Sequence, residues 1–301
     1  MKLYKYILTT LIAGVLSFGT SGVLQAQQNN AAQWMQQARD AGIEQSVLDE
    51  FQGHVNDKSI TEDQLASIIR SAIAMSKQDL PADILINKAL EGFSKGVPGE
   101  RVVSVIGQLE QSVAKAAAIV DPWMKKPEVQ QMMNRSGSAM PKERFRNELT
   151  KATSKSFMQN MSSESLGKVF DQVGSSSVLS KSGPAEVIAA MGILPDLPSS
   201  ASNPGRAGEF VVRALKGGFN ANELQKLPSA MKVAQQRSQL PAASVIEGVA
   251  GQMQGNIPAK QILQNLFNGK VGGGPPGDIP KGIDKNKGRG TGNSNGNTNG
   301  N

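Results

Sequence analysis

The chain has no cysteine and a single histidine among its 301 residues. Without cysteine it can form no disulfide framework, offers no thiol nucleophile and carries no N-terminal cysteine for lipid attachment. A Ser–His–Asp triad or a histidine-based metal site would have to use His54, which lies in the polar stretch FQGHVNDKS. A histidine in such a stretch is typical of a helix C-terminus, where it interacts with the last carbonyl groups. We therefore predict no metal site, no cofactor and no catalytic histidine.

Long apolar runs are also missing, apart from one at the N-terminus. Two lysines precede a short apolar stretch, Ile7–Leu16, and small and polar residues follow up to Ala26. This layout predicts a secretory signal peptide over residues 1–26. The alternative is an uncleaved anchor, because residues 7–24 span 18 positions, although Thr, Ser and Gly interrupt them. We expect an exported protein, periplasmic or extracellular, with no membrane span after signal removal.

Charge of one sign is not concentrated in the body of the chain. The formal net charge is +7, and it falls to +5 without the two lysines of the signal peptide. The tail, residues 271–301, carries four basic and two acidic side chains, which leaves about +3 for the body. A mildly basic body predicts no specific nucleic-acid binding.

The sequence contains one short motif that occurs three times in altered form. KGVPGERV (95–102) returns in altered form as SAMPKERF (138–145) and GNIPAKQI (255–262). A proline fits the first turn of a helix, where its missing N–H would have no partner. Gly96, just before the apolar residue and the proline, suits the left-handed position that ends the preceding helix. The motif therefore predicts the end of one helix, a corner and the start of the next helix.

The corners recur at regular spacing. Their apolar residues are Ile43, Ile60, Leu80, Val97, Phe219, Leu240 and Ile257. One helix pair spans 37 residues in the first group and 38 in the second, and LPADILINKALEGFSKGVP aligns with LPAASVIEGVAGQMQGNIP without a gap. Thr61 with Gln64 predicts a capping box beside one corner, and Asn220 an N-cap beside another. We predict an all-α fold of helix-hairpin repeats, stacked as a short solenoid or arranged as an irregular helical bundle. The tetratricopeptide repeat has a similar period, but its Trp, Gly, Tyr and Ala positions are absent, so no family is assigned.

These patterns divide the chain into five segments. We expect a signal peptide (1–26), N-terminal hairpin repeats (27–120), a Met/Ser-rich helical connector (121–205), a C-terminal hairpin repeat (206–270) and a disordered Gly/Asn-rich basic tail (271–301). Within the connector, helices are expected over 141–161 and 163–173. The stretches SSSVLSKSGP and LPDLPSSASNPGR predict loops. The methionine cluster of the connector is interpreted as adaptable core.

Two partial catalytic motifs occur in the connector. Ser165 to Lys168 spells S-x-x-K and Lys181 to Gly183 spells K-S-G, which resembles penicillin-binding proteins and β-lactamases. Only 12 residues separate the two motifs, no asparagine lies among them and no strand is predicted. Glu164 followed by serine resembles the Glu-Ser pair of lytic transglycosylases, but the neighbouring sugar-cleft motifs are absent. A sugar cleft also needs aromatic platforms, and the chain has two tryptophans.

The sequence thus favours a binding protein over an enzyme. We predict an exported, non-enzymatic helical scaffold or protein-binding module of the cell envelope, with a protein as its partner. One alternative is a peptidoglycan-acting enzyme that uses Glu164 or Ser165. Another is a surface or matrix protein whose basic tail makes weak contacts to a polyanion.

Overall fold

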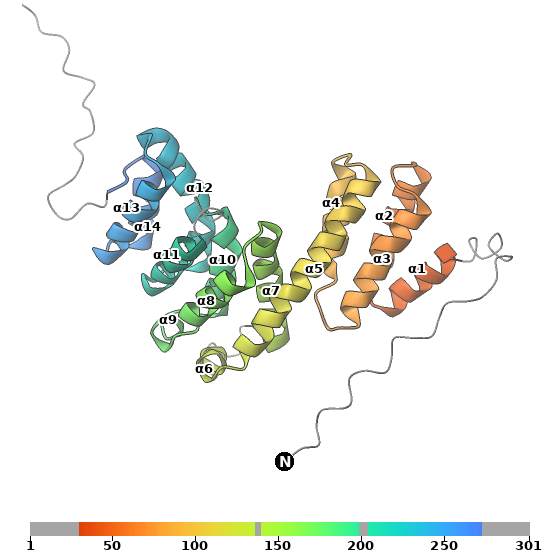
Figure 1. Ribbon diagram of the computed structural model, residues 1–301, viewed down its shortest axis with the longest axis horizontal. Helices are drawn as coiled ribbons and strands as arrows, with labels where there is room; N and C mark the ends of the chain where they lie inside the picture. The colour runs from red at the N-terminus through yellow and green to blue at the C-terminus, as the bar shows by residue number, and fades with distance from the viewer. Residues whose placement is uncertain (1–29, 136–139, 199–203, 273–301) are drawn as a thin grey trace, which may run out of the picture. The chain divides into compact units, whose positions relative to one another are not determined.

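The computed structural model describes residues 30–135, 140–198 and 204–272 (Figure 1). The described residues form helices, turns and connecting segments and contain no strand, so the predicted all-α class is confirmed. The predicted signal peptide lies outside the described residues, and so does the predicted tail beyond Gly272. The chain divides into two compact units, Met1–Gly107 and Gln108–Asn301, and each is described by itself.

Unit 1 is built around its third helix. Its elements are α1 (Asn30–Asp40), α2 (Gln45–Asn56), α3 (Glu62–Ser76), α4 (Asp83–Ser94) and the first turns of α5 (Gly99–Met124). Helix α3 packs against α1, α2 and α4. Its buried face consists of Leu65, Ile68, Ile69, Ala72, Ile73 and Met75, which recur with helical periodicity.

Alternate helices of unit 1 run in the same direction. At the C-terminal ends of α3 and α1, the Ser76 hydroxyl donates a hydrogen bond of 3.4 Å to the Ala41 carbonyl. At the opposite ends, the Gln64 side chain of α3 lies against Gly99, the first residue of α5. Because like ends meet, α1, α3 and α5 are parallel, and α2 and α4 return the chain between them.

The corners between helices share one backbone geometry. Nine described residues have positive φ, and each follows the C-terminus of a helix: Gly42, Lys58, Asp79, Gly96, Asn160, Gly218, Gln239, Asn256 and Gly269. Gly96 has a φ of 69°. The amide of the next residue, Val97, donates a hydrogen bond of 3.0 Å to the Gly92 carbonyl. This bond is the signature of the Schellman motif. It recurs at Ile43, Leu80, Met161, Phe219 and Ile257. The left-handed position predicted at Gly96 is confirmed.

Gly96→Ala tests this geometry without disturbing packing. A Cβ at Gly96 would meet no atom within 4 Å, so the substitution acts through the left-handed backbone alone. We expect it to lower the free energy of unfolding by about 1 kcal/mol. Gly53→Ala, in α2 and equally open, should raise stability by up to about 1 kcal/mol because its backbone is helical. Urea unfolding followed by circular dichroism measures both, and equal shifts of the two variants would contradict the assignment.

Unit 2 holds the rest of α5 and the remaining helices. They are α6 (Pro127–Arg135), α7 (Lys142–Met158), α8 (Ser163–Val173), α9 (Ser176–Leu179), α10 (Pro184–Ile193), a 3-10 turn η2 (Leu194–Asp196), α11 (Pro204–Lys216), α12 (Ala221–Ser238), α13 (Ala242–Gln254) and α14 (Ala259–Phe267). The predicted helices 141–161 and 163–173 correspond to α7 and α8.

Helices of unit 2 also pack with partners beyond the next helix. One series of contacts joins α7 to α10, α10 to α12 and α12 to α14, and a second joins α8 to α11 and α11 to α13. At the C-terminal ends of α12 and α14, Arg237 lies beside Gly269, so these two helices run in the same direction. A single hydrophobic core extends from Val120 to Leu266, and both the predicted connector and the predicted C-terminal repeat contribute to it.

Two segments predicted as loops contain helix instead. In SSSVLSKSGP, Ser176 to Leu179 form α9, because Val178 and Leu179 are buried in the core and Arg135 donates hydrogen bonds to the carbonyls of Leu179 and Ser182. In LPDLPSSASNPGR, the last three residues begin α11, with proline in the first turn. The first prediction was wrong for Ser176–Leu179 and the second for Pro204–Arg206, because serine, proline and glycine at a helix start look like loop residues.

The helix caps and the methionine core agree with the sequence analysis. Thr61 and Gln64 form the predicted capping box of α3, and Asn220 caps α12 in a second box with Glu223. Five methionines of the connector are buried in the core of unit 2: Met124, Met132, Met133, Met161 and Met191. The thioether side chains are therefore packing groups here, as the sequence predicted.

Candidate functional site

Glu164 lies in the first turn of α8 with its side chain 79% exposed. The Lys168 ammonium donates a hydrogen bond of 2.6 Å to its carboxylate. This hydrogen bond, together with the positive charge of Lys168, holds the pKa of Glu164 below its ordinary value. A general acid has to keep its proton near neutral pH, which requires a raised pKa. The surroundings of Glu164 act in the opposite direction.

Ser165 and the K-S-G motif take part in helix starts. The Ser165 amide donates to the Ser162 hydroxyl, which in turn donates 2.9 Å to the Ser165 hydroxyl, and this pair caps α8. Lys168 is engaged by Glu164 instead of by Ser165. Lys181 is exposed, Ser182 is buried, and the following glycine is the N-cap of α10. The two motifs therefore do not supply a serine activated by a neighbouring base.

His54 lies in the last turn of helix α2. Its Nδ1 lies 3.2 Å from the Ser59 hydroxyl, which donates 2.8 Å to the His54 carbonyl. The imidazole ring also packs against Phe93 with 5.2 Å between centroids. These contacts fit the predicted place at a helix C-terminus. Within the described ranges, no three His, Cys, Asp or Glu side chains group closely enough to hold a metal ion.

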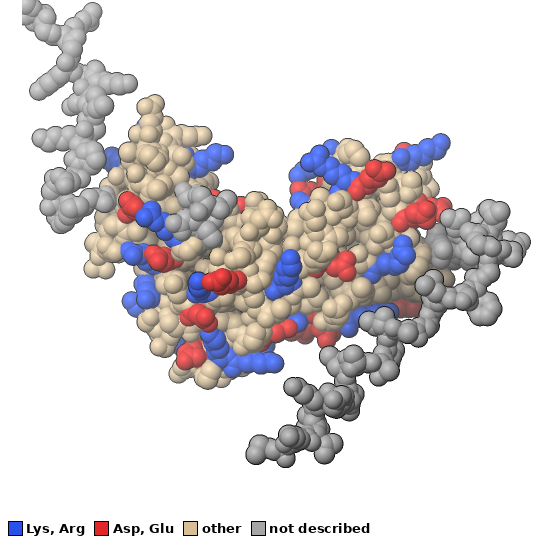
Figure 2. All heavy atoms as spheres, in the orientation of Figure 1, with Lys and Arg blue, Asp and Glu red and all other residues tan. Residues whose placement is uncertain are grey.

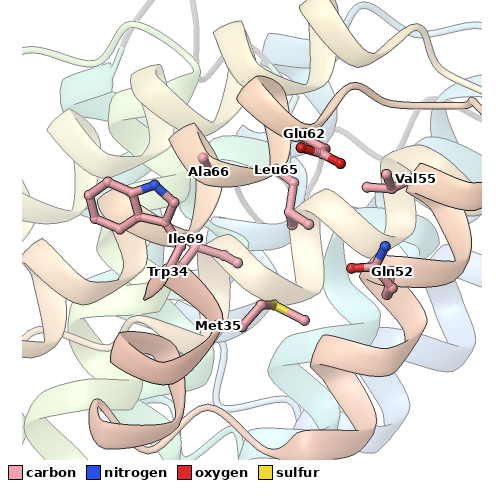
Figure 3. A pocket seen from close by; sticks show the side chains of 8 residues that line it. All are labelled: Trp34, Met35, Gln52, Val55, Glu62, Leu65, Ala66 and Ile69. Atoms are coloured by element: carbon pink, nitrogen blue, oxygen red, sulfur yellow. The ribbon is translucent and has the colours of Figure 1, made fainter. Parts of the chain in front are cut away.

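A pocket that sequence reasoning did not find lies in unit 1 among α1, α2 and α3. Its cavity volume is about 20 Å³, which is room for about one water molecule. Figure 3 shows the side chains that line it: Trp34 and Met35 from α1, Gln52 and Val55 from α2, and Glu62, Leu65, Ala66 and Ile69 from α3. This volume lies far below the roughly 300 Å³ at which the range for ligand sites begins, so the pocket has no room for a side chain or a small molecule.

The wall of this pocket is apolar, and one acidic residue, Glu62, belongs to its lining. Leu65 and Ile69 are 6% and 1% exposed, and Met35 is half-buried beside them. The Glu62 side chain is exposed in the first turn of α3 and forms no ion pair with any other described residue. The Arg70 guanidinium lies over the Trp34 ring, 5.2 Å from its centroid, in a cation–π contact.

The two units carry opposite formal charges. Residues 30–107 contain seven Lys and Arg against eleven Asp and Glu, a net charge of −4. Residues 108–272 contain nineteen basic and twelve acidic side chains, a net charge of +7. On the face shown in Figure 2, side chains of both signs are interspersed. The net charge of the whole body is small because the two charges partly cancel. Counting charged residues separately in each segment of the sequence would have found this asymmetry.

No family model, no curated protein and no solved structure matches the chain. In the part of the chain that the structure describes, no helix has both the length and the apolar character needed to cross a bilayer.

Proposed function

We propose that the protein is an exported, non-enzymatic helical scaffold of the cell envelope that binds a protein partner. The observation that carries the proposal is the packing of alternate helices in parallel, α1 with α3 in unit 1 and α12 with α14 in unit 2. Such packing supports a stacked array of helix hairpins with a period of about 37 residues. Arrays of this kind bind partners over an extended surface and need no reactive side chain.

The chemistry of the candidate residues supports a binding role over catalysis. Glu164, the acid of the enzyme alternative, is exposed and paired with Lys168, and that pairing favours its ionised form. The small hollow among α1, α2 and α3 of unit 1, in contrast, is lined mainly by apolar side chains, with the exposed Glu62 among them.

Export is proposed from residues 1–26, whose basic start, apolar core and small residues match a signal peptide. A second candidate function is binding of a polyanion such as an anionic polysaccharide. The net charge of +7 over residues 108–272, continued by the basic tail, favours it.

Affinity capture from envelope extracts tests the proposal. Residues 27–301 are the bait, and a deletion of residues 273–301 is compared with it, because Val271 still packs against Gly248. We expect both baits to enrich the same protein at physiological salt, because the helical body makes the contact. Enrichment of no protein above a tag-only control would overturn the scaffold proposal. Loss of capture on deletion, together with heparin binding that falls steeply with salt, would favour the polyanion.

A further inference from the structure

We propose that the protein binds further copies of itself head to tail. The outer face of α1 in one copy contacts the outer face of α14 in the next copy. Each of these helices ends the packing of its unit, each leaves apolar surface exposed, and the two carry opposite charges around them. Such self-association goes beyond the proposed function and needs no other protein.

Helix α1 ends the packing in unit 1. It packs mainly against α3, and Gln64 of α3 lies against the first residue of α5. Trp34 and Met35 of α1 are large and apolar, yet both are only half-buried. In a stack of helix hairpins each hairpin covers its neighbour, so the terminal hairpin keeps one face without a neighbour. The first helix thus leaves apolar surface at this end of unit 1.

Helix α14 ends the packing in unit 2. It is the last member of the series α7, α10, α12 and α14, and it packs against α12 and α13. Phe267, its last residue, is 38% exposed and is the one large apolar side chain exposed in the part of the chain that the structure describes. Lys260 and Gln264, seven and three residues earlier, are exposed on the same side of the helix. A terminal hairpin that only meets water has a polar outer face, and Phe267 departs from that rule.

The first hairpin is acidic. Residues 30–63, the acidic end, contain seven Asp and Glu against two Lys and Arg, a net charge of −5. None of these seven carboxylates forms an ion pair with another described residue. Glu62 is exposed and lines the same small hollow as Trp34 and Met35. Negative charge and half-buried apolar side chains therefore lie close together at this end.

The last helices are basic to the same extent. Residues 204–272, the basic end, contain eight Lys and Arg against three Asp and Glu, a net charge of +5. Arg237 and Lys270 are exposed at the C-terminal ends of α12 and α14, where Arg237 lies beside Gly269. Neither forms an ion pair with another described residue. Positive charge therefore lies close to the exposed Phe267.

These charges make a second copy the occupant of both faces. Two acidic ends repel each other, and so do two basic ends, which disfavours a symmetric dimer through either face. Contact between α1 and α14 joins opposite charges and removes Phe267 from water against Trp34 and Met35. Because the two faces differ, every bound copy still offers one of each. The assembly therefore grows as an open chain or closes into a ring.

Sedimentation velocity of the protein of residues 27–301 measures the association. We expect species larger than the monomer to increase with protein concentration at about 0.1 M salt. Raising the salt to about 1 M shortens the screening length from about 10 Å to about 3 Å. Association should then weaken at least about tenfold, because the opposite charges attract each other less.

Two variants that each alter one end identify the contact. The head variant, Glu50→Lys with Glu62→Lys, changes the net charge of the acidic end from −5 to −1. The tail variant, Phe267→Ser with Lys270→Glu, removes the exposed ring and changes the basic end from +5 to +3. Each variant alone should associate at least about tenfold more weakly, because every contact then includes one altered face. An equimolar mixture should form dimers and nothing larger, because the intact basic end of one variant meets the intact acidic end of the other.

Glu100→Lys with Glu143→Lys is the matched control for the head variant. Both glutamates are exposed in the first turns of α5 and α7, which are not terminal helices, and the net charge changes by the same amount. This control should associate like the unaltered protein. Circular dichroism verifies that all variants keep their helix content.

The inference is overturned if the unaltered protein stays monomeric at about 100 μM, a concentration at which even weak specific contacts form. It is also overturned if the mixed variants form no dimer, or if the control weakens association as much as the head variant does. A symmetric contact would leave one of the two variants unaffected, which equally contradicts the proposal. Association that appears only after deletion of residues 273–301 would show that the chain's own C-terminal segment covers α14, and would overturn it too.

Discussion

Trp123→Ala is expected to lower the stability of unit 2 by about 3–5 kcal/mol, the largest effect of any substitution proposed here. Trp123 is 2% exposed and packs edge-on against Phe170, with ring centroids 5.3 Å apart. It also packs against Phe145, with 6.4 Å between the ring centroids. Its indole N–H donates a hydrogen bond of 2.8 Å to the Phe170 carbonyl. Truncation would therefore leave a cavity where α5, α7 and α8 meet.

The indole hydrogen bond contributes a small part of this effect. The Phe170 carbonyl also accepts a hydrogen bond from the Gly174 amide, so it keeps one partner when the indole is removed. Trp123→Phe, which keeps an aromatic ring, should accordingly cost less, about 1–3 kcal/mol. Because both variants lack the indole N–H, the difference between them measures what a phenyl ring contributes by packing alone.

Urea unfolding followed by circular dichroism measures both variants. Trp34→Ala is the control in unit 1, where the ring is half-buried and its loss should cost at most about 1–2 kcal/mol. Separate transitions of the two units would show which one each substitution affects. An unchanged midpoint for Trp123→Ala would contradict the placement of this ring in the core.

Gly208→Ala is expected to destabilise unit 2 by about 1–3 kcal/mol. Gly208 is buried in α11, and a Cβ there would collide with the Cγ2 of Val169 in α8. Val169 is 3% exposed and β-branched, so it has little freedom to turn away. The close approach of α8 and α11 depends on the missing side chain.

Gly167→Ala is the matched control for Gly208→Ala. Gly167 lies in the middle of α8, and a Cβ there would meet no atom within 4 Å. Alanine should raise stability at this position by up to about 1 kcal/mol because it restricts the unfolded chain and favours the helix. Thermal unfolding compares the two variants, and a stabilised Gly208→Ala protein would show that the two helices do not approach as closely as described.

The corners show how far local chemistry determines this fold. Gly96 takes up the left-handed position at low cost, and the apolar residue and proline that follow it mark the start of α5. The capping boxes at Thr61 and Asn220 were equally readable, because each consists of two side chains three residues apart. These signals involve neighbours in the chain, so a single sequence suffices to find them.

Some corners use residues that sequence reasoning does not associate with positive φ. Lys58 and Gln239 both have a φ of 57°, although neither is glycine, asparagine or aspartate. Each such residue costs about 1 kcal/mol or more in that region. Burial of nearby apolar side chains offsets this cost, as at Ile60, which is 4% exposed. Packing of the following apolar residue therefore determines where these corners form. The spacing of the apolar corner residues predicted the corners better than the residue type at the positive-φ position did.

The sequence by itself thus determined that the protein is helical, where most helices end, and that cysteine chemistry is excluded. It also contained the charge asymmetry between residues 30–107 and 108–272, although only counting by segment shows it. Tertiary structure alone decided which apolar stripes meet, because helices with similar stripes can pack in several orders. The Trp123–Phe170 hydrogen bond joins residues 47 positions apart, and the pocket needs side chains from three helices. No local pattern specifies such contacts, since they form only when separate helices pack together.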